Sequence, residues 1–119
     1  RELLHSVTCF GYRFSLEGRT IAYCPDTGYC RNAVRLAEGA DLLITECAFL
    51  QGMENINWPH LNPETAIRIA REAGARQLAL VHFDAHLYRT LEDRYAIRDT
   101  FSHDFPGLQV ATDGLCLSV

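Results

Sequence analysis

Short apolar runs without alternation mark the central strands of this chain. Leu42–Thr45 is one such run, and Gln77–Val81 is another. Runs of this kind are typical of parallel strands that are covered on both faces. Between them, Asn62 is a helix N-cap and Pro63 occupies the first helical position, which predicts a helix that ends at Gly74. We therefore expect a strand-helix-strand unit with parallel strands.

The flanking sequence adds strands and helices on both sides of this unit. Residues that favour strands, turn residues and helical spacing each contribute to the prediction. The predicted elements are a strand over Leu3–Leu16, a turn at Glu17-Gly18, a return strand over Thr20–Cys24, a helix over Asn32–Glu38, a loop over Gln51–Pro59, a helix from the cap Thr90 to Ser102, and a hairpin of Leu108–Thr112 with Leu115–Val119 around Asp113-Gly114.

Polar residues stand where the predicted strands end. Asp26 follows the second strand, Glu46 follows Leu42–Thr45, and His82 follows Gln77–Val81. The carboxyl ends of parallel strands meet at one edge of a sheet, so Glu46 and His82 should share that edge. We expect Asp26 and His60, which directly precedes a helix start, to meet His82 there.

Imidazole and carboxylate groups suit zinc, manganese or iron(II), and an aspartate can bridge two ions with its two oxygens. Two ions held in this way can clamp the attacking and leaving oxygens of a displacement at phosphorus or at a carbonyl. The alternative is that Asp26 is only a turn residue and that the histidines are structural or lie at the surface.

Composition narrows the class of protein. The chain has 119 residues, 48% of them apolar, and its net charge is -4. This length predicts one domain, and no apolar run approaches a membrane span, so we expect no membrane partner. All basic residues are arginines. The nearest approach to a basic cluster is Arg68, Arg71 and Arg76, which we interpret as a solvated helix face rather than a nucleic-acid surface.

Five cysteines without a Cys-x-x-Cys pair argue against a disulfide framework and against a thiolate zinc site. Reduced thiols of this kind are typical of cytosolic proteins. We therefore expect a cytoplasmic location.

Six short segments together carry a resemblance to a known family. They are His5–Arg13, Tyr23–Thr27, Leu43–Phe49, His60–Ala66, Leu80–Phe83 and Thr112–Leu115. In this order they resemble the carboxyl-terminal half of the metallo-β-lactamase-fold hydrolases, most closely the ribonuclease Z-like and phosphodiesterase branch. The resemblance implies an α/β fold, one half of an αββα sandwich with a mixed sheet and helices on one face. Residues 1–119 would form this single half-domain.

The resemblance also implies a function. It predicts a metal-dependent hydrolase that cleaves a phosphodiester with a metal-bound hydroxide, as a nuclease or a small phosphodiesterase. Asp26 would bridge two divalent ions, His82 would be a terminal ligand, and His60 would protonate the leaving oxygen. The ions would be zinc, with manganese or iron as alternatives.

The other polar residues have open roles. Glu46 either holds a ligand by a hydrogen bond or faces water. For His86 we favour a structural or substrate-edge role over metal ligation. For His5 we favour a core or hydrogen-bonding role somewhat over one in the active site, and we keep it as a candidate that contacts a ligand residue or lies at the edge of the substrate.

Two departures from the family pattern limit the prediction. The His-x-His-x-Asp-His run that supplies most metal ligands is absent. The chain alone should therefore be inactive, lack its amino-terminal half, and associate with itself through the uncovered sheet face. The short span from Arg13 to Asp26 leaves no room for the arm that grips transfer RNA, which favours a smaller phosphodiester.

The alternative functions are a metal-free α/β module for association or binding, and a hydrolase-like domain that has lost catalysis.

Overall fold

A computed structural model describes all residues, 1–119, and contains a single five-stranded sheet. The strands are β1 (Tyr12–Leu16), β2 (Arg19–Cys24), β3 (Leu42–Glu46), β4 (Gln77–Val81) and β5 (Leu108–Val110). They lie in the order β1-β2-β3-β4-β5. β1 is antiparallel to β2, whereas the other neighbours are parallel. The predicted mixed sheet is confirmed.

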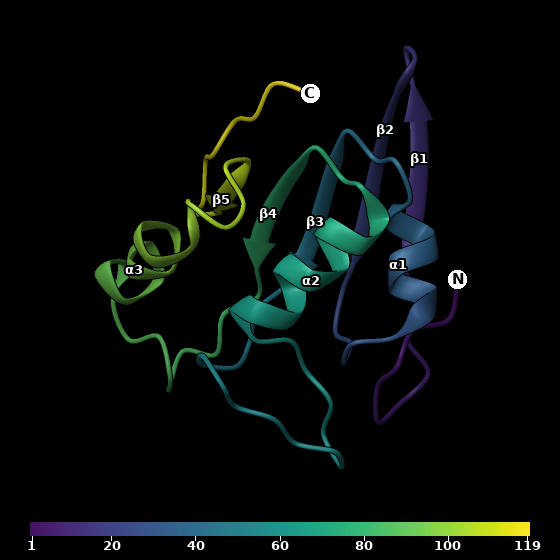
Figure 1. Cartoon of the computed structure of the whole chain (residues 1–119). Coiled ribbons are helices and arrows are strands. Elements are labelled where there is room, and N and C mark those ends of the chain that lie inside the picture. The colour runs from purple at the N-terminus through teal and green to yellow at the C-terminus, as the bar shows by residue number, and fades with distance from the viewer.

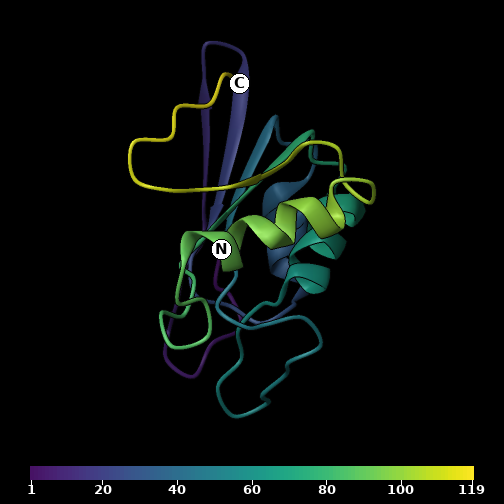
Figure 2. The same ribbon diagram turned by 90° about the vertical axis from the view of Figure 1, so that its left-hand side faces the viewer.

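Three helices cover one face of the sheet (Figures 1 and 2). They are α1 (Arg31–Ala37), α2 (Pro63–Ala73) and α3 (Leu91–Phe101). The start of α2 is fixed by a capping box, in which the side chain of Asn62 accepts a hydrogen bond from the backbone N–H of Thr65. Thr90 caps α3 in the same way. Both helix starts predicted from the sequence are therefore confirmed.

The core lies between the sheet and the helices. Every second strand residue points toward the helices, and these residues include Leu43, Leu78 and Leu80, all fully buried. On the helix side, α1 and α2 contribute small residues such as Ala33 and Ala70, also fully buried. Small side chains let the helices approach the sheet and each other closely, which gives a dense core in a short chain.

The opposite face of the sheet is only partly covered. Tyr12, Phe14 and Leu16 of β1 point to this side and are 53%, 54% and 71% exposed. The chain after β5 crosses this face (Figure 2), and the side-chain amide of Gln77 donates a hydrogen bond to the carbonyl of Ser118. The tail reaches this face near Val119, but the apolar side chains of β1 remain more than half exposed.

The strand register brings the predicted polar residues to one edge. Cys24 of β2 lies opposite Thr45 of β3, and Glu46 lies opposite Val81 of β4. The residues that follow β2 and β4 therefore emerge beside the end of β3. The expectation that these strands deliver polar side chains to the same edge of the sheet is confirmed.

The first predicted strand is wrong over most of its length. Residues 3–11 form a loop, which is closed by a hydrogen bond from Leu3 N–H to Cys9 O at 2.8 Å. Further along the loop, Leu4 N–H donates to Thr27 Oγ1, and Gly28 N–H donates to Leu4 O. These bonds tie the loop to itself and to the segment after β2 rather than to a neighbouring strand, so its strand-forming residue types do not decide its structure.

The closing hairpin is also predicted incorrectly in part. The turn forms, because Gly114 has a φ of 84° and Leu115 N–H donates to Thr112 O. However, β5 ends at Val110, and the residues after the turn do not pair with it. The reason is that their backbone finds a partner elsewhere, at Gln77, as the tail crosses the sheet.

No helix of the structure is long and apolar enough to cross a membrane. All five cysteines are free, with Cys24 and Cys47 buried and Cys116 exposed.

Replacing Leu80 by alanine should test where the core lies. Leu80 is fully buried between sheet and helices. Its truncation is expected to lower the free energy of unfolding by about 3 kcal/mol, measured by urea denaturation. Ile56, which is 93% exposed, supplies the control, and Ile56→Ala should change that free energy by less than about 0.5 kcal/mol. Equal losses in the two variants would contradict the assigned core.

Candidate functional site

Four side chains converge at the carboxyl edge of the sheet. Ligand atoms of His5, Asp26 and His60 all lie within 4.8 Å of one another. His82 joins them, with its Nε2 atom 3.3 Å from Asp26 Oδ1. The ring centroids of His60 are 5.1 Å from those of His5 and 6.1 Å from those of His82. Three imidazoles thus surround a single carboxylate.

The loops that carry His5 and Asp26 are tied together beside the site. Thr27, the residue after Asp26, is fully buried and accepts a hydrogen bond from Leu4 N–H at 3.2 Å. Gly28 lies close against the segment that leads to His60, since an added Cβ would be 2.8 Å from Pro59 Cβ. The backbone can approach this closely only at glycine. Three segments distant in sequence are therefore held in contact.

His82 turns the chain sharply at the end of β4. Its φ of 53° lies in the left-handed region, which is uncommon for a residue other than glycine. Such a backbone costs on the order of 1–2 kcal/mol and persists only where its surroundings hold it. Here the turn places the imidazole, 57% exposed, next to Asp26.

Behind these residues lies Glu46, a fully buried carboxylate at the end of β3. Its Oε1 atom accepts a hydrogen bond from Thr27 N–H at 3.0 Å and lies 2.7 Å from His60 Nδ1. Its Oε2 atom accepts from Ala48 N–H at 2.8 Å. Burial raises the pKa of Glu46, and the hydrogen bonds from Thr27, Ala48 and His60 oppose that rise.

This pairing decides which nitrogen of His60 is available for chemistry. Both oxygens of Glu46 accept backbone N–H bonds, which favours its ionised form, and an ionised carboxylate would accept a further hydrogen bond from His60 Nδ1–H. The other nitrogen, Nε2, is buried and has no hydrogen-bond partner in the protein. Nε2 therefore points away from Glu46, and this atom can either transfer a proton or bind a metal ion.

Aromatic rings form one wall around His60. The ring of Trp58 lies 4.7 Å from that of His60, and the ring of Phe49 lies 5.5 Å from it, both edge-on. His60 itself lies two residues before Asn62, the N-cap of α2. The packing of the two aromatic rings and the bond to Glu46 together fix the orientation of the imidazole.

The donor set fits divalent first-row metal ions. Both ring nitrogens of His5 are buried without a hydrogen-bond partner, as is His60 Nε2. Unpartnered buried nitrogens are costly in a folded protein unless something binds them. With the Asp26 carboxylate among them, they form the imidazole and carboxylate mixture that zinc, manganese and iron(II) accept.

The structure assembles most, but not all, of the candidate site residues. Asp26, His60 and His82 lie together, and Glu46 lies behind His60. His86 is exposed on the turn after β4, where its backbone N–H donates to Asp84 Oδ1, and it is not part of this group.

His5 lies more centrally in the site than the sequence alone indicates. The residue types predict a core or hydrogen-bonding role for it, whereas its ring reaches Asp26 and His60. Its segment is rich in strand-forming residues, and no glycine or proline between Leu3 and Phe10 signals the loop that turns the ring into the site. Only the family motif around His5 pointed to this region.

Replacing Glu46 by glutamine tests the pair at the base of the site. A glutamine amide has one NH₂ group, which would face at least one of the N–H groups that now donate to Glu46. That buried N–H group would then have no acceptor. The free energy of unfolding should fall by about 2 kcal/mol. The NMR signals of the His60 ring nitrogens should also move. Glu54→Gln, at an exposed loop residue, should change neither quantity, and an unchanged His60 spectrum in Glu46→Gln would contradict the pairing.

The family profile and the related sequences that match this chain point to the same family. The profile of the Beta-lactamase superfamily domain matches residues 2–83. Ribonuclease Z from Thermobifida fusca is 44% identical over 86 residues, which are 71% of this chain and 27% of that protein. The probable metallo-hydrolase YhfI from Bacillus subtilis is 38% identical over 79 residues, 66% of this chain and 32% of that protein.

Solved structures agree with the fold. The metallo-beta-lactamase fold protein YhfI from Bacillus subtilis superposes with a TM-score of 0.82 at 32% identity, over 97% of this chain and 46% of that one. Human tRNase Z, short form, superposes with a TM-score of 0.69 at 23% identity, over 98% and 40%, which shows the fold alone. This chain spans about a third or less of the curated relatives it matches. The chain belongs to the beta-lactamase superfamily, is ribonuclease Z-like, and represents one part of a metallo-β-lactamase fold.

Proposed function

We propose that the longer protein containing this chain is a metal-dependent hydrolase of small phosphodiesters. The observation that carries the proposal is the cluster of His5, Asp26, His60 and His82, with the buried Glu46 behind it. A single structural carboxylate would not explain unpartnered nitrogens on two neighbouring buried imidazoles. A site that binds cations and moves a proton explains both.

The residues divide into two roles. Together with His5, Asp26 and His82 would hold two divalent ions. We propose that these ions are zinc, with manganese or iron as alternatives. Such ions supply an ionised water near neutral pH and neutralise charge on the phosphoryl oxygens. Asp26 has two oxygens and lies between the imidazoles, which suits it to a position shared by both ions.

His60 is the catalytic acid in this proposal. Its Nδ1–H is engaged by Glu46, so a proton that leaves the ring for the departing oxygen must come from Nε2. The aromatic wall of Trp58 and Phe49 excludes water on one side and limits ring rotation. Glu46 is a positioning residue, because it acts through His60 and does not reach substrate.

The small substrate is inferred from the hairpin of β1 and β2. Leu16 pairs with Arg19, and only Glu17 and Gly18 lie between the strands. The family resemblance implies that the transfer-RNA-processing members insert their arm where this tight turn stands. The family resemblance together with the missing arm favours a phosphodiester smaller than a transfer RNA precursor.

Isolated from its parent, the chain should be inactive. Its ligands at the site come from one wall only, and two ions need more than His5, Asp26 and His82 to complete their coordination. The exposed apolar face of β1 and β2 is where we place the missing amino-terminal half, because this chain matches only 46% of the YhfI structure.

Activity and metal content of the parent protein should separate the two roles. The test uses hydrolysis of bis-nitrophenyl phosphate and metal analysis of the purified protein. Asp26→Ala and His82→Ala should lose both metal and turnover. His60→Gln should retain its metal but lose about 10²–10⁴-fold in kcat. His103→Gln supplies the control, since His103 is exposed outside the site, and this variant should behave as the wild type.

Each contrary outcome has a defined meaning. Full activity in both Asp26→Ala and His82→Ala would overturn the site assignment. A wild-type parent that binds metal without turnover would be a hydrolase-like domain that has lost catalysis. A parent that binds no metal would be an association or binding module.

Light scattering tests the uncovered sheet face. At micromolar concentration the isolated chain should be a dimer or larger, because apolar surface of this size is seldom left open to water. Phe14→Glu, which places a charge at the centre of that face, should shift the population toward monomer. Ile56→Glu, at an exposed residue of the loop before His60, should leave the population unchanged. A stable wild-type monomer would contradict the prediction.

A further inference from the structure

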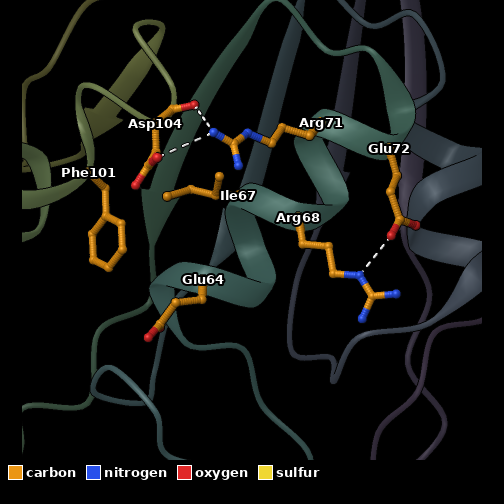
Figure 3. Close-up of a pocket in the computed structure, with 7 residues that line it drawn as sticks. All are labelled: Glu64, Ile67, Arg68, Arg71, Glu72, Phe101 and Asp104. Atoms are coloured by element: carbon orange, nitrogen blue, oxygen red, sulfur yellow. Dashed lines mark hydrogen bonds and ion pairs between the residues drawn. The ribbon is translucent and has the colours of Figure 1, made fainter.

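Hollows on this surface differ in whether their charged groups are already paired. One hollow of about 310 Å³ lies between α2 and the end of α3 (Figure 3). Its arginines have partners within the protein, since Arg71 contacts Asp104 and Arg68 pairs with Glu72 at 2.7 Å. These pairs stabilise the helical face, and neither arginine is free to bind a ligand there.

A larger hollow adjoins the candidate site. Its volume is about 640 Å³, which lies within the range of small-molecule sites. The lining residues are Val81, His82, Phe83, Leu91, Arg94, Ala111, Thr112 and Asp113. His82 belongs both to this hollow and to the candidate site. A ligand group in the hollow would therefore lie next to a group bound at Asp26.

Arg94 is the unusual member of this lining. Its Nε atom is buried without a hydrogen-bond partner, and no carboxylate lies within ion-pair distance of it. The guanidinium carbon lies over the ring of Phe83, 5.5 Å from its centre, which is a cation–π contact. One turn further along α3, Arg98 pairs with Asp99. Arg94 therefore has donors available for a ligand, whereas Arg98 is already engaged.

The rest of the lining indicates what kind of ligand these donors would meet. Half of the residues are hydrophobic, and the polar ones are His82, Arg94, Thr112 and Asp113. The charges of Arg94 and Asp113 balance, so a second phosphate would be attracted by one and repelled by the other. A flat neutral ring with apolar faces and both acceptors and donors along its edge complements all of these groups.

We propose that this hollow binds a nucleobase of the substrate, attached next to the phosphodiester that is cleaved. The inference rests on the proposed function and narrows its substrate to a nucleotide-type phosphodiester. The base lies against Val81, Leu91 and Ala111. Acceptors on its edge receive hydrogen bonds from Arg94, and its N–H groups donate to Asp113. Arg94 and Asp113 are thus specificity-determining residues.

Binding can be measured without turnover. Amide NMR signals of the chain are recorded during titration with uncharged nucleosides and, separately, with inorganic phosphate. Nucleosides should shift the signals of Phe83, Thr112 and Asp113, and these shifts should be lost in Arg94→Gln. Arg98→Gln, on the same helix, should retain them. Shifts of these signals with phosphate but not with any nucleoside would overturn the proposal.

Kinetics of the parent give a second test with a matched pair of substrates. The nitrophenyl ester of thymidine monophosphate carries a base, whereas methyl nitrophenyl phosphate has the same leaving group and no base. Arg94→Gln and Asp113→Asn should each lower kcat/KM for the thymidine ester by about tenfold, the loss expected for a hydrogen bond to a charged group. The value for the methyl ester should stay within about twofold, which is roughly 0.4 kcal/mol in the barrier.

The two proposals fail in different ways. If the wild-type parent cleaves neither ester, the proposed function fails, and nucleoside titration of the chain still decides whether the hollow binds a base. If the parent cleaves both esters and Arg94→Gln lowers both values equally, the function stands and the base-binding hollow is contradicted.

Discussion

The site depends on one buried carboxylate. Glu46 is the last residue of β3, and its two oxygens interact with the loop after β2, with Ala48, and with His60. A buried charge is tolerated only when such partners satisfy it. Because Thr27 and His60 come from separate segments, the need to satisfy this carboxylate brings those segments together. The hydrogen bond to His60 therefore both stabilises the buried Glu46 carboxylate and orients the imidazole of the site.

The sheet supplies the frame on which that interaction acts. Parallel pairing of β2, β3 and β4 ends all three strands at one edge, so residues directly after them meet without long connections. The helices cover only one face, and the apolar side chains of β1 remain on the other. In our proposal, this half of the sandwich fixes its own wall of the site, and another part of the protein supplies the opposite wall and the opposite sheet.

Sequence patterns predicted what depends on local periodicity and missed what depends on distant hydrogen bonds. Leu42–Thr45 and Gln77–Val81 are mainly apolar runs, and their ends located Glu46 and His82 without a structure. The role of His5 could not be read in this way, because its loop is shaped by contacts with Thr27 and Gly28. Likewise, nothing in the sequence distinguishes Arg94 from the paired Arg98, since pairing is a property of the tertiary structure.

We propose that His5, Asp26 and His82 hold the metal ions while His60 serves as the acid. Anomalous X-ray scattering from crystals of the zinc-loaded parent would show which side chains bind the ions. We expect zinc peaks about 2.0–2.2 Å from Asp26 oxygens and from His82 and His5 nitrogens, with His60 Nε2 outside that distance and His60 Nδ1 still hydrogen-bonded to Glu46. A zinc ion bound to His60, or crystals in which Asp26 and His82 have no zinc beside them, would contradict it.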